Sequence, residues 1–307
     1  MNKAFVLGAG LGTRLKLLTD QLPKPLIPVF HRPLITYAFD HLMGAGIKEF
    51  IVNTHHLPGC YDAAFPDRTY RGAPITFRHE PVLLETAGGI ANIADLVSGD
   101  SFIVYNGDIL TDLPLPPLIA AHQQTNHLVT LVLRSTGPAR HIAFDEKSGK
   151  VTDIRNKLQT GNDGTHQFTG IYAVHPEFLK HLTPGKVESV IPIFIKLIQE
   201  GASIGGVVID EGFWWDLGDR DSYLDAHAAL LERNPEAAPV SPQANIAPDS
   251  HLKGLNIISG GATVEAGATL EDCILWPDAH VLEGACLQRC IVRRGMTASG
   301  DLKNADV

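Results

Sequence analysis

The sequence predicts an α/β domain with a largely parallel sheet, followed by a short left-handed parallel β-helix. Two patterns indicate this. In the first part of the chain, short apolar runs alternate with amphipathic segments, as they do in βα units. From residue 246 onward, apolar side chains recur every six residues, which is the hexapeptide repeat of a β-helix. A Pro/Ala-rich stretch at 234–245 predicts a linker, so we expect domains over 1–233 and 246–307.

The expected elements of the first domain follow from these runs. They are a strand at 4–7, a helix at 34–46, strands at 49–53 and 74–79, a helix at 86–97 and a strand at 101–105. Closely spaced strand-like runs then occur at 127–134, 142–144, 151–154 and 168–174, and they predict an added β-rich lobe rather than another βαβ unit. Helices are expected at 188–200 and 219–233.

The repeat that predicts the β-helix has one irregularity. Its apolar register runs through Ile246, Leu252, Ile258, Val264, Leu270 and Trp276, then slips by one residue and resumes at Val281 and Leu287. Small residues such as Ser250, Ala262 and Ala268 occupy the fifth place of several hexads. A repeat of about 60 residues predicts some three coils.

Composition excludes several classes of partner. The formal net charge of -9 argues against nucleic acid or an anionic membrane as the main partner. No apolar run reaches the length of a membrane span, and the apolar run before Gly8 is too short for a signal peptide. The four cysteines have no CxxC spacing, which favours free thiols in a reducing compartment. We therefore expect a cytoplasmic protein.

A glycine-dense turn after the first apolar strand predicts an anion-binding loop. Gly8, Gly10 and Gly12 would let backbone N–H groups approach a phosphate, although a tight structural turn stays open. Arg14 and Lys24, the latter between two prolines, add cations. The loop matches neither a Walker A sequence nor the G-x-G-x-x-G turn of a dinucleotide-binding fold.

Two aspartates are candidate metal ligands. Asp108 directly follows the strand at 101–105, at the edge of the sheet where ligands bind, although a turn-forming role is the alternative. Asp216 lies among bulky apolar residues, so its carboxylate needs a partner. That partner is either a metal such as Mg²⁺ or the start of the helix near Asp219.

The run GAGLGTR, followed ten residues later by Lys-Pro, resembles the nucleotide-binding signature of the sugar-1-phosphate nucleotidylyltransferases, or NDP-sugar pyrophosphorylases. The resemblance covers 3–233 and returns in the repeat. It implies a Rossmann-like mixed sheet of the glycosyltransferase-A type. The whole arrangement is similar to mannose-1-phosphate guanylyltransferases, and the ETAGG segment is also similar to N-acetylmuramate-1-phosphate uridylyltransferases.

The resemblance also implies roles for individual residues. Arg14 and Lys24 would be catalytic, acting on the triphosphate, and Mg²⁺ would bind Asp108 and Asp216. The nucleotide would be bound by Leu7, Gly8, Ala9, Gly10, Gly12, Thr13, Arg14, Glu85, Thr86 and Gly88. The sugar phosphate would be bound by Asn106, Lys157, Thr169 and Gly170. This chain departs from the family at Asn156, where the family has Glu, and at Asp219, where it often has Thr.

The implied reaction joins a nucleoside triphosphate to a sugar 1-phosphate and releases pyrophosphate, by positioning and charge neutralisation without a protein nucleophile. A carboxylate at Glu85 would favour guanine if it faces the base, but a helix-capping or solvent-facing role leaves GTP and UTP open. The sugar, a homo-oligomer through the β-helix and a regulatory role of that domain also stay open. A non-catalytic sugar-nucleotide-binding subunit is the alternative of another class, and the presence of Lys24, Asp108 and Asp216 argues against it.

Overall fold

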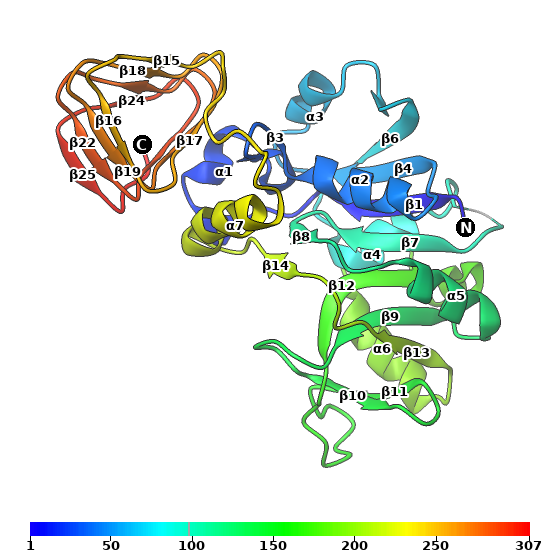
Figure 1. Cartoon of the computed structure of the whole chain (residues 1–307). Coiled ribbons are helices and arrows are strands. Elements are labelled where there is room, and N and C mark those ends of the chain that lie inside the picture. Colours follow the sequence, from blue (N-terminus) through cyan, green and yellow to red (C-terminus); the bar gives the residue numbers. More distant parts are fainter. Residues whose placement is uncertain (98) are drawn as a thin grey trace. The chain divides into compact units, whose positions relative to one another are not determined.

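The computed structural model describes residues 1–97 and 99–307 and divides them into two compact units (Figure 1). The first unit comprises Met1–Leu11 and Ile35–Trp215, and the second comprises Gly12–Leu34 and Asp216–Val307. Among the described residues, every helix is too short or too polar to cross a bilayer.

A ten-stranded mixed sheet forms the centre of the first unit. Its strands are β1 (Lys3–Leu7), β4 (Glu49–Thr54), β5 (Thr69–Tyr70), β6 (Ala73–His79), β7 (Phe102–Asn106), β9 (Val129–Arg134), β10 (Ile142–Asp145), β11 (Lys150–Ile154), β12 (Gln167–Val174) and β13 (Ile204–Val208). Their order is β10-β11-β13-β9-β12-β7-β1-β4-β6-β5. Strand β1 is parallel to β4 and to β7, as the buried apolar run at its centre predicts.

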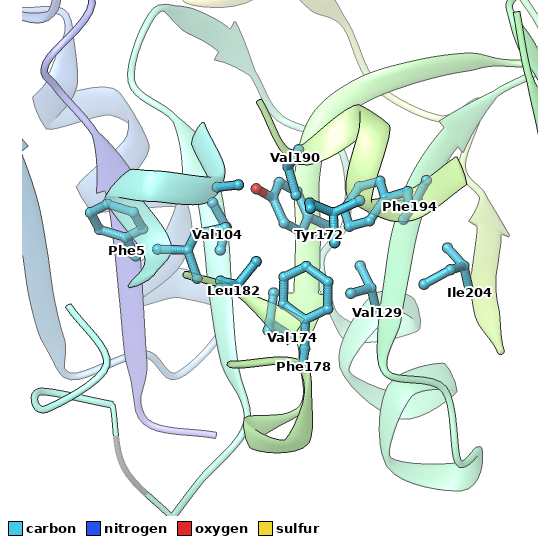
Figure 2. Close-up of a cluster of buried hydrophobic side chains, with 14 of the residues drawn as sticks. Phe5, Val104, Val129, Tyr172, Val174, Phe178, Leu182, Val190, Phe194 and Ile204 are labelled. Carbon is cyan, nitrogen blue, oxygen red and sulfur yellow. The ribbon is translucent and has the colours of Figure 1, made fainter. Parts of the chain in front are cut away.

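Helices and short strands complete this unit. They are α2 (Ile35–Gly44), α3 (Gly59–Ala64), α4 (Glu85–Asn92), β8 (Ile109–Thr111), α5 (Pro116–Gln124), the 3₁₀ helix η3 (Pro176–His181), α6 (Val190–Gln199) and β14 (Trp214–Asp216). Figure 2 shows the packing between sheet and helices, where Phe5, Tyr172 and Phe194 belong to one buried cluster. The predicted α/β class is confirmed. The helix expected at 86–97 is shorter, because the backbone leaves helical geometry at Ile93.

The prediction of a separate β-rich lobe is wrong. Strands β9 to β13 belong to the same sheet as β1, and β12 pairs antiparallel with both β7 and β9. Antiparallel neighbours need no helical crossover, so closely spaced strands can extend an existing sheet. Strand spacing in the sequence does not distinguish this extension from a new lobe.

The second unit combines a β-helix with the segment that follows the first glycines. That segment holds η1 (Thr13–Leu15), α1 (Leu18–Gln21), η2 (Lys24–Leu26), β2 (Pro28–Val29) and β3 (Arg32–Pro33), and helix α7 (Arg220–Arg233) precedes the repeat. The repeat strands are β15 (Asn245–Ile246), β16 (His251–Lys253), β17 (Ile257–Ile258), β18 (Thr263–Val264), β19 (Thr269–Glu271), β20 (Ile274–Leu275), β21 (His280–Val281), β22 (Cys286–Gln288), β23 (Ile291–Val292), β24 (Thr297–Ala298) and β25 (Asp301–Lys303).

These strands form three parallel sheets of four, four and three strands, which Figure 1 shows nearly end-on as a triangle. Val264, Leu270 and Val281 lie in the core of the coil, as the repeat predicts, whereas Leu252 in the first coil is exposed, so the prediction is wrong there. At the slip in register, Leu275 rather than Trp276 takes the core position. The corner before it is one residue shorter, with Asp272 at a φ of 53°. Trp276 is buried elsewhere, and its indole N–H donates to the Tyr223 hydroxyl at 3.0 Å.

Candidate active site

The glycine loop begins where β1 ends, and its first glycine is required for packing. A Cβ on Gly8 would lie 2.6 Å from the backbone oxygen of Asn53 and 2.8 Å from the Tyr61 hydroxyl. The Gly8 N–H donates to Asn53 Oδ1 at 2.8 Å, and Tyr61 donates to the Gly8 carbonyl at 2.8 Å. Gly10, by contrast, is exposed and has no atom within 4 Å of a Cβ position. The two glycines therefore serve different purposes.

A buried polar network that the sequence did not predict lies behind this loop. Asn53 accepts from the Gly8 N–H and donates to Glu80 Oε1 at 2.8 Å. The other oxygen of Glu80 accepts from the Leu84 N–H at 3.0 Å, and Glu80 is fully buried. The network thus links the glycine loop to the segment that starts α4. The signal available in the sequence was a polar residue at or just after the end of each of two apolar strands, at Asn53 and Glu80.

The structure brings the ends of β1 and β7 together. Leu7 and Asn106 are partners in the parallel register, and the Gly107 N–H donates to the Leu7 carbonyl at 3.1 Å. A Cβ on Gly107 would lie 2.4 Å from that oxygen. Half-buried Asp108 follows in the turn between β7 and β8. Asp108 therefore lies at the carboxyl edge of the sheet beside the glycine loop, which is where ligands bind in open α/β sheets.

Asn106 and Gly170 also meet, across the pair of β7 and β12. Gly170 has a φ of 83°, and a Cβ there would lie 2.5 Å from Asn106 Nδ2. The register of β12 against β9 is irregular between Phe168 and Tyr172, so the glycine sits in a bulge. Thr169 is buried and its hydroxyl donates to the Val132 carbonyl at 3.0 Å. The Thr169 side chain therefore maintains the bulge.

The ETAGG segment forms the first turn of α4. The Thr86 hydroxyl accepts from the Val190 N–H at 2.8 Å, while the N–H groups of Ala87 and Gly88 donate to the Glu188 carbonyl at 2.9 and 3.2 Å. A Cβ on Gly88 would lie 2.3 Å from the Lys186 oxygen, so glycine allows this close approach. Glu85 is exposed, at a φ of 58°.

Lys157 lies on a cationic groove of about 590 Å³, which it lines together with Arg155, Lys196 and apolar side chains of α6. Asp153 shapes the loop that carries Lys157. It is buried and accepts from the N–H groups of Ile154 at 2.7 Å and Leu158 at 3.1 Å. Burial alone would raise the pKa of Asp153, but these hydrogen bonds outweigh it and lower the pKa.

The side chain of Asn156, where the family has Glu, makes hydrogen bonds within this loop. Its Oδ1 accepts from the Gly161 N–H at 3.1 Å, and its Nδ2 donates to Asp163 Oδ1 at 3.2 Å. The backbone at Asn156 has a φ of 49°, a conformation that Asn tolerates better than Glu. The amide therefore supports the loop that presents Lys157.

In the second unit, Arg14 and Lys24 converge on one carboxylate. Lys24 Nζ lies 3.5 Å from Asp216 Oδ1, and its side chain is only 6% exposed. Arg14 Nη2 lies 3.5 Å from Asp216 Oδ2, and that side chain is 64% exposed. Gly12, at a φ of 62°, packs against Lys24, since a Cβ there would lie 3.0 Å from Lys24 Cβ. Two cations therefore share one carboxylate, and the exposed Arg14 guanidinium can reach an incoming phosphate.

The capping alternative for Asp216 is wrong, because Asp219 caps α7. Its carboxylate accepts from the Ser222 N–H at 2.9 Å, and the Ser222 hydroxyl closes a capping box. The hydrogen bonds from Ser222 and the charge of Arg14 lower the pKa of Asp219. Aspartate here does what threonine would do at an N-cap, so this departure from the family preserves the local structure.

Similarity to known proteins shows the family to which the chain belongs. The family model described as nucleotidyl transferase matches residues 3–233. The mannose-1-phosphate guanylyltransferase of Mycobacterium tuberculosis is 29% identical over 302 residues, which cover 93% of this chain and 83% of that protein. The N-acetylmuramate alpha-1-phosphate uridylyltransferase of Neisseria meningitidis serogroup B is 32% identical over 218 residues, covering 70% and 93%. The crystal structure of HddC from Yersinia pseudotuberculosis shares the fold, with a TM-score of 0.63 at 20% identity over 75% of this chain and all of that chain.

Proposed function

Because the chain belongs to the nucleotidyl transferase family, we propose that it joins a nucleoside triphosphate to a sugar 1-phosphate and releases pyrophosphate. The observation that carries this proposal is the convergence of Arg14 and Lys24 on Asp216. Both cations of this cluster come from the segment that follows the glycine loop, and the Arg14 side chain is 64% exposed. The cluster is suited to holding a triphosphate and to stabilising the pyrophosphate that departs.

In the proposed reaction, a phosphate oxygen of the sugar 1-phosphate attacks the α-phosphorus of the nucleotide in line. A new P–O bond forms, the bond from the α-phosphorus to the α,β-bridging oxygen breaks, and pyrophosphate leaves with that oxygen. Exposed Gly10 and the neighbouring N–H groups would approach the phosphates closely. The side chains of Arg14 and Lys24 would lower the cost of charge that builds up on the leaving group.

Asp108 and Asp216 are the residues that we propose to hold the Mg²⁺ that such chemistry uses, each judged by its own carboxylate. Carboxylate oxygens are the ligands that this hard ion prefers, and Mg²⁺ needs only one or two of them when a substrate supplies phosphate oxygens. Within residues 1–97 and 99–307, no group of three or more His, Cys, Asp or Glu side chains could hold a metal alone. In the part of the chain that the structure describes, Asp216 Oδ1 is buried and accepts no hydrogen bond, and its only near cation is Lys24 Nζ at 3.5 Å, so a metal ion would add a partner to this carboxylate. When bound, Mg²⁺ would neutralise phosphate charge.

The sugar phosphate is proposed to bind through Lys157 and through Asn106 with Gly170. The groove at Lys157 carries three basic side chains, which supports an anionic substrate. Asn106 stands against a glycine that has no side chain to cover it, so its amide can serve a sugar hydroxyl. The Thr169 side chain contributes indirectly, by holding the bulge.

We propose GTP and a mannose-type sugar 1-phosphate as the substrates, because the resemblance to the mycobacterial guanylyltransferase extends over 93% of this chain. An exposed carboxylate at Glu85, in the first turn of α4, is able to accept from guanine N1–H and its amino group. The alternative is UTP with N-acetylmuramate 1-phosphate, favoured by the higher identity, 32%, to the uridylyltransferase over a shorter stretch.

The test measures pyrophosphate release from each of four nucleoside triphosphates with a panel of sugar 1-phosphates, with and without Mg²⁺. We expect the highest kcat/KM with GTP and mannose 1-phosphate, and none without a divalent metal. A preference for UTP with N-acetylmuramate 1-phosphate would establish the alternative. Absence of release with every pair would refute the catalytic proposal and favour a sugar-nucleotide-binding subunit.

A further inference from the structure

We propose that the β-helix positions the triphosphate-binding cations, and that Arg220 and Arg293 are the positioning residues. This inference rests on the proposed function, because it concerns the cluster of Arg14, Lys24 and Asp216. All the residues involved belong to the second unit. Neither arginine lies in the glycine signature, and neither is expected to touch a substrate.

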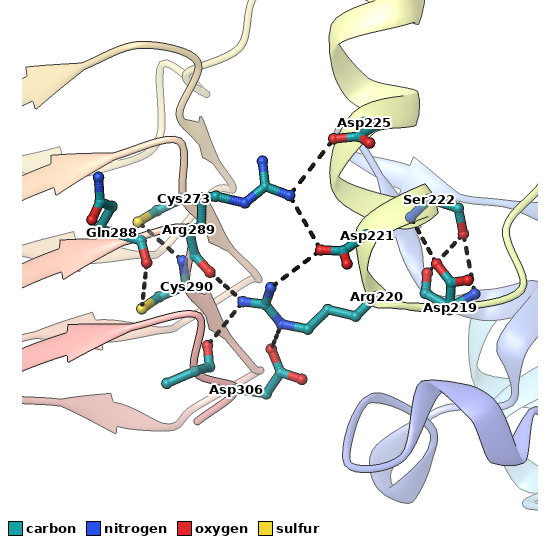
Figure 3. Close-up of polar contacts among 11 residues, drawn as sticks. Asp219, Arg220, Asp221, Ser222, Asp225, Cys273, Gln288, Arg289, Cys290 and Asp306 are labelled. Carbon is teal, nitrogen blue, oxygen red and sulfur yellow. Dashed lines mark hydrogen bonds and ion pairs between the residues drawn. The ribbon is translucent and has the colours of Figure 1, made fainter.

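Arg220 ties the start of α7 to the last coils of the β-helix (Figure 3). Its Nε lies 2.6 Å from Asp306 Oδ1, and its Nη2 donates to the carbonyls of Arg289 and Ala305. The side chain is only 20% exposed. A guanidinium with one carboxylate and two carbonyl acceptors is held far more rigidly than a surface ion pair.

The segment from Asp216 to Asp219 carries this anchoring back to the cation cluster. Leu217 is fully buried, and Gly218 packs against the Arg14 guanidinium, since a Cβ there would lie 2.5 Å from Arg14 Nη1. Asp219 is the N-cap of α7, directly before Arg220. Asp216 is thus separated from Arg220 by two buried residues and by the N-cap of α7, so a shift of α7 would displace Asp216.

Arg293 anchors the other side of the cluster. Its side chain is 11% exposed, and its Nη1 donates to the carbonyl of Leu17, three residues after Arg14, at 3.0 Å. Its Nε donates to the Val307 oxygen at 3.0 Å, so the same guanidinium holds the last coil. Nearby, Gln21 Nε2 donates to the Arg294 carbonyl at 3.2 Å.

The segment that carries Lys24 is anchored as well. The hydroxyl of Tyr223, a fully buried residue of α7, donates to the carbonyl of Pro28, four residues after Lys24. Trp276 of the β-helix donates its indole N–H to the same hydroxyl at 3.0 Å. Each of the three segments that supply the cluster therefore makes a polar contact with α7 or the β-helix, or leads directly into α7.

These contacts matter for the reaction because in-line transfer is sensitive to position. A misplacement of about 1 Å, caused far from the reacting atoms, can reduce a rate about 100-fold. Loss of Arg220 frees Asp306 and two carbonyls and loosens the first turn of α7. We expect Arg14 and Asp216 to lose their fixed position while the sugar-phosphate residues of the first unit keep theirs.

The experiment compares Arg220→Ala, Arg220→Lys and Arg293→Ala with the wild-type full-length chain. We expect the KM for the triphosphate to rise about tenfold and kcat to fall about tenfold or more in both alanine variants, with an unchanged KM for the sugar 1-phosphate. Arg220→Lys keeps the pair with Asp306 and loses the two-pronged geometry, so its values should be intermediate. Asp306→Asn is the milder substitute if Arg220→Ala does not fold.

Arg289→Ala is the matched control. The Arg289 side chain bridges the β-helix to Asp221 at 3.2 Å and to Asp225 at 3.7 Å, and it is partly exposed (Figure 3). The substitution removes an ion pair between the same two elements but leaves the backbone carbonyl that accepts from Arg220. We expect its kinetic constants to stay within about twofold of wild type.

Two outcomes would overturn the inference. One is an unchanged KM for the triphosphate in Arg220→Ala, with activity falling only in proportion to the folded fraction seen by circular dichroism. The other is an equal effect of Arg289→Ala. If the wild type releases no pyrophosphate, the proposed function fails, and titration calorimetry with GTP alone still tests the positioning. Equal GTP affinity of wild type and Arg220→Ala, or no GTP binding by the wild type, would then refute it.

Discussion

Replacement of Gly8 and of Gly10 by alanine should separate folding from nucleotide binding within one loop. A Cβ at position 8 would lie 2.6 Å from the Asn53 oxygen and 2.8 Å from the Tyr61 hydroxyl and Val52 Cγ1. Two of these three atoms belong to β4 (Glu49–Thr54), so the sheet itself must shift. Overpacking of a buried site typically costs about 1–3 kcal/mol. At position 10 nothing lies within 4 Å, so Gly10→Ala should leave stability unchanged or raise it by about 0.5 kcal/mol.

Thermal unfolding and steady-state kinetics measure the two effects. Gly8→Ala should lower Tm by about 5 °C, given about 2–4 °C per kcal/mol for a domain of this size. Gly10→Ala should keep the wild-type Tm and raise the KM for the triphosphate about tenfold, because a methyl group occupies the surface that approaches the phosphates. A wild-type Tm for Gly8→Ala would refute the packing argument. A wild-type KM for Gly10→Ala would refute the assignment of the loop to phosphate binding.

Three further predictions concern buried charges and hydrogen bonds. Lys24→Met keeps an apolar stem in the buried site, so the variant should fold normally. Its kcat in the pyrophosphate assay should fall about 100-fold, because the cation is lost. A decrease in kcat of less than threefold would contradict a contact between Lys24 and the triphosphate. Burial lowers the pKa of His227 from 6.5 to about 4. The unfolded chain therefore takes up a proton at His227 before the folded protein does. The free energy of unfolding is at its full value above pH 6.5 and decreases as pH falls from 6.5 toward 4. Urea unfolding should show about 2 kcal/mol of acid sensitivity at pH 5 that His227→Gln lacks, and an unchanged pH profile in the variant would exclude this residue. Asp153→Asn weakens the hydrogen bonds that Asp153 accepts from Leu158 and Thr160. The KM for the sugar 1-phosphate should therefore rise about fivefold, and the KM for the triphosphate should not change. Equal increases in both KM values would indicate general unfolding instead.

Periodicity predicted much of the fold because burial imposes it on the sequence. The apolar runs at β1, β4 and β7 had to be strands of a parallel sheet, since they are buried on both faces. The six-residue repeat predicted the core of the coil down to individual positions such as Leu270 and Val281. The wrong predictions concern features about which the local sequence pattern carries no information. One is the sheet that a strand joins, and the other is the position before Leu275 where a shortened corner shifts the register of the repeat.

The candidate site was less predictable, because its groups meet through the fold. Asn53 and Glu80 show no motif, and only the pairing of β4 with β6 brings them behind Gly8. The partners of Asp216 were also hidden, since Arg14 and Lys24 lie about two hundred positions earlier in the chain. Sequence reasoning identified these three residues by chemistry, but only the structure shows that they neutralise one another in part.

The division of the signature between the two units explains why a nucleotide-binding protein would keep a β-helix. Gly8 and Gly10 belong to the first unit, directly after β1, whereas Arg14 and Lys24 belong to the second unit together with the coil. The cations thus lie in a segment whose only regular elements are short helices and a two-stranded sheet, too little to bury a core of its own. Such a segment needs an external scaffold to hold two like charges in place, and Arg293 and Trp276 supply contacts of that kind. On this reasoning, substitutions deep in the coil should alter triphosphate binding before they alter the sugar-phosphate site.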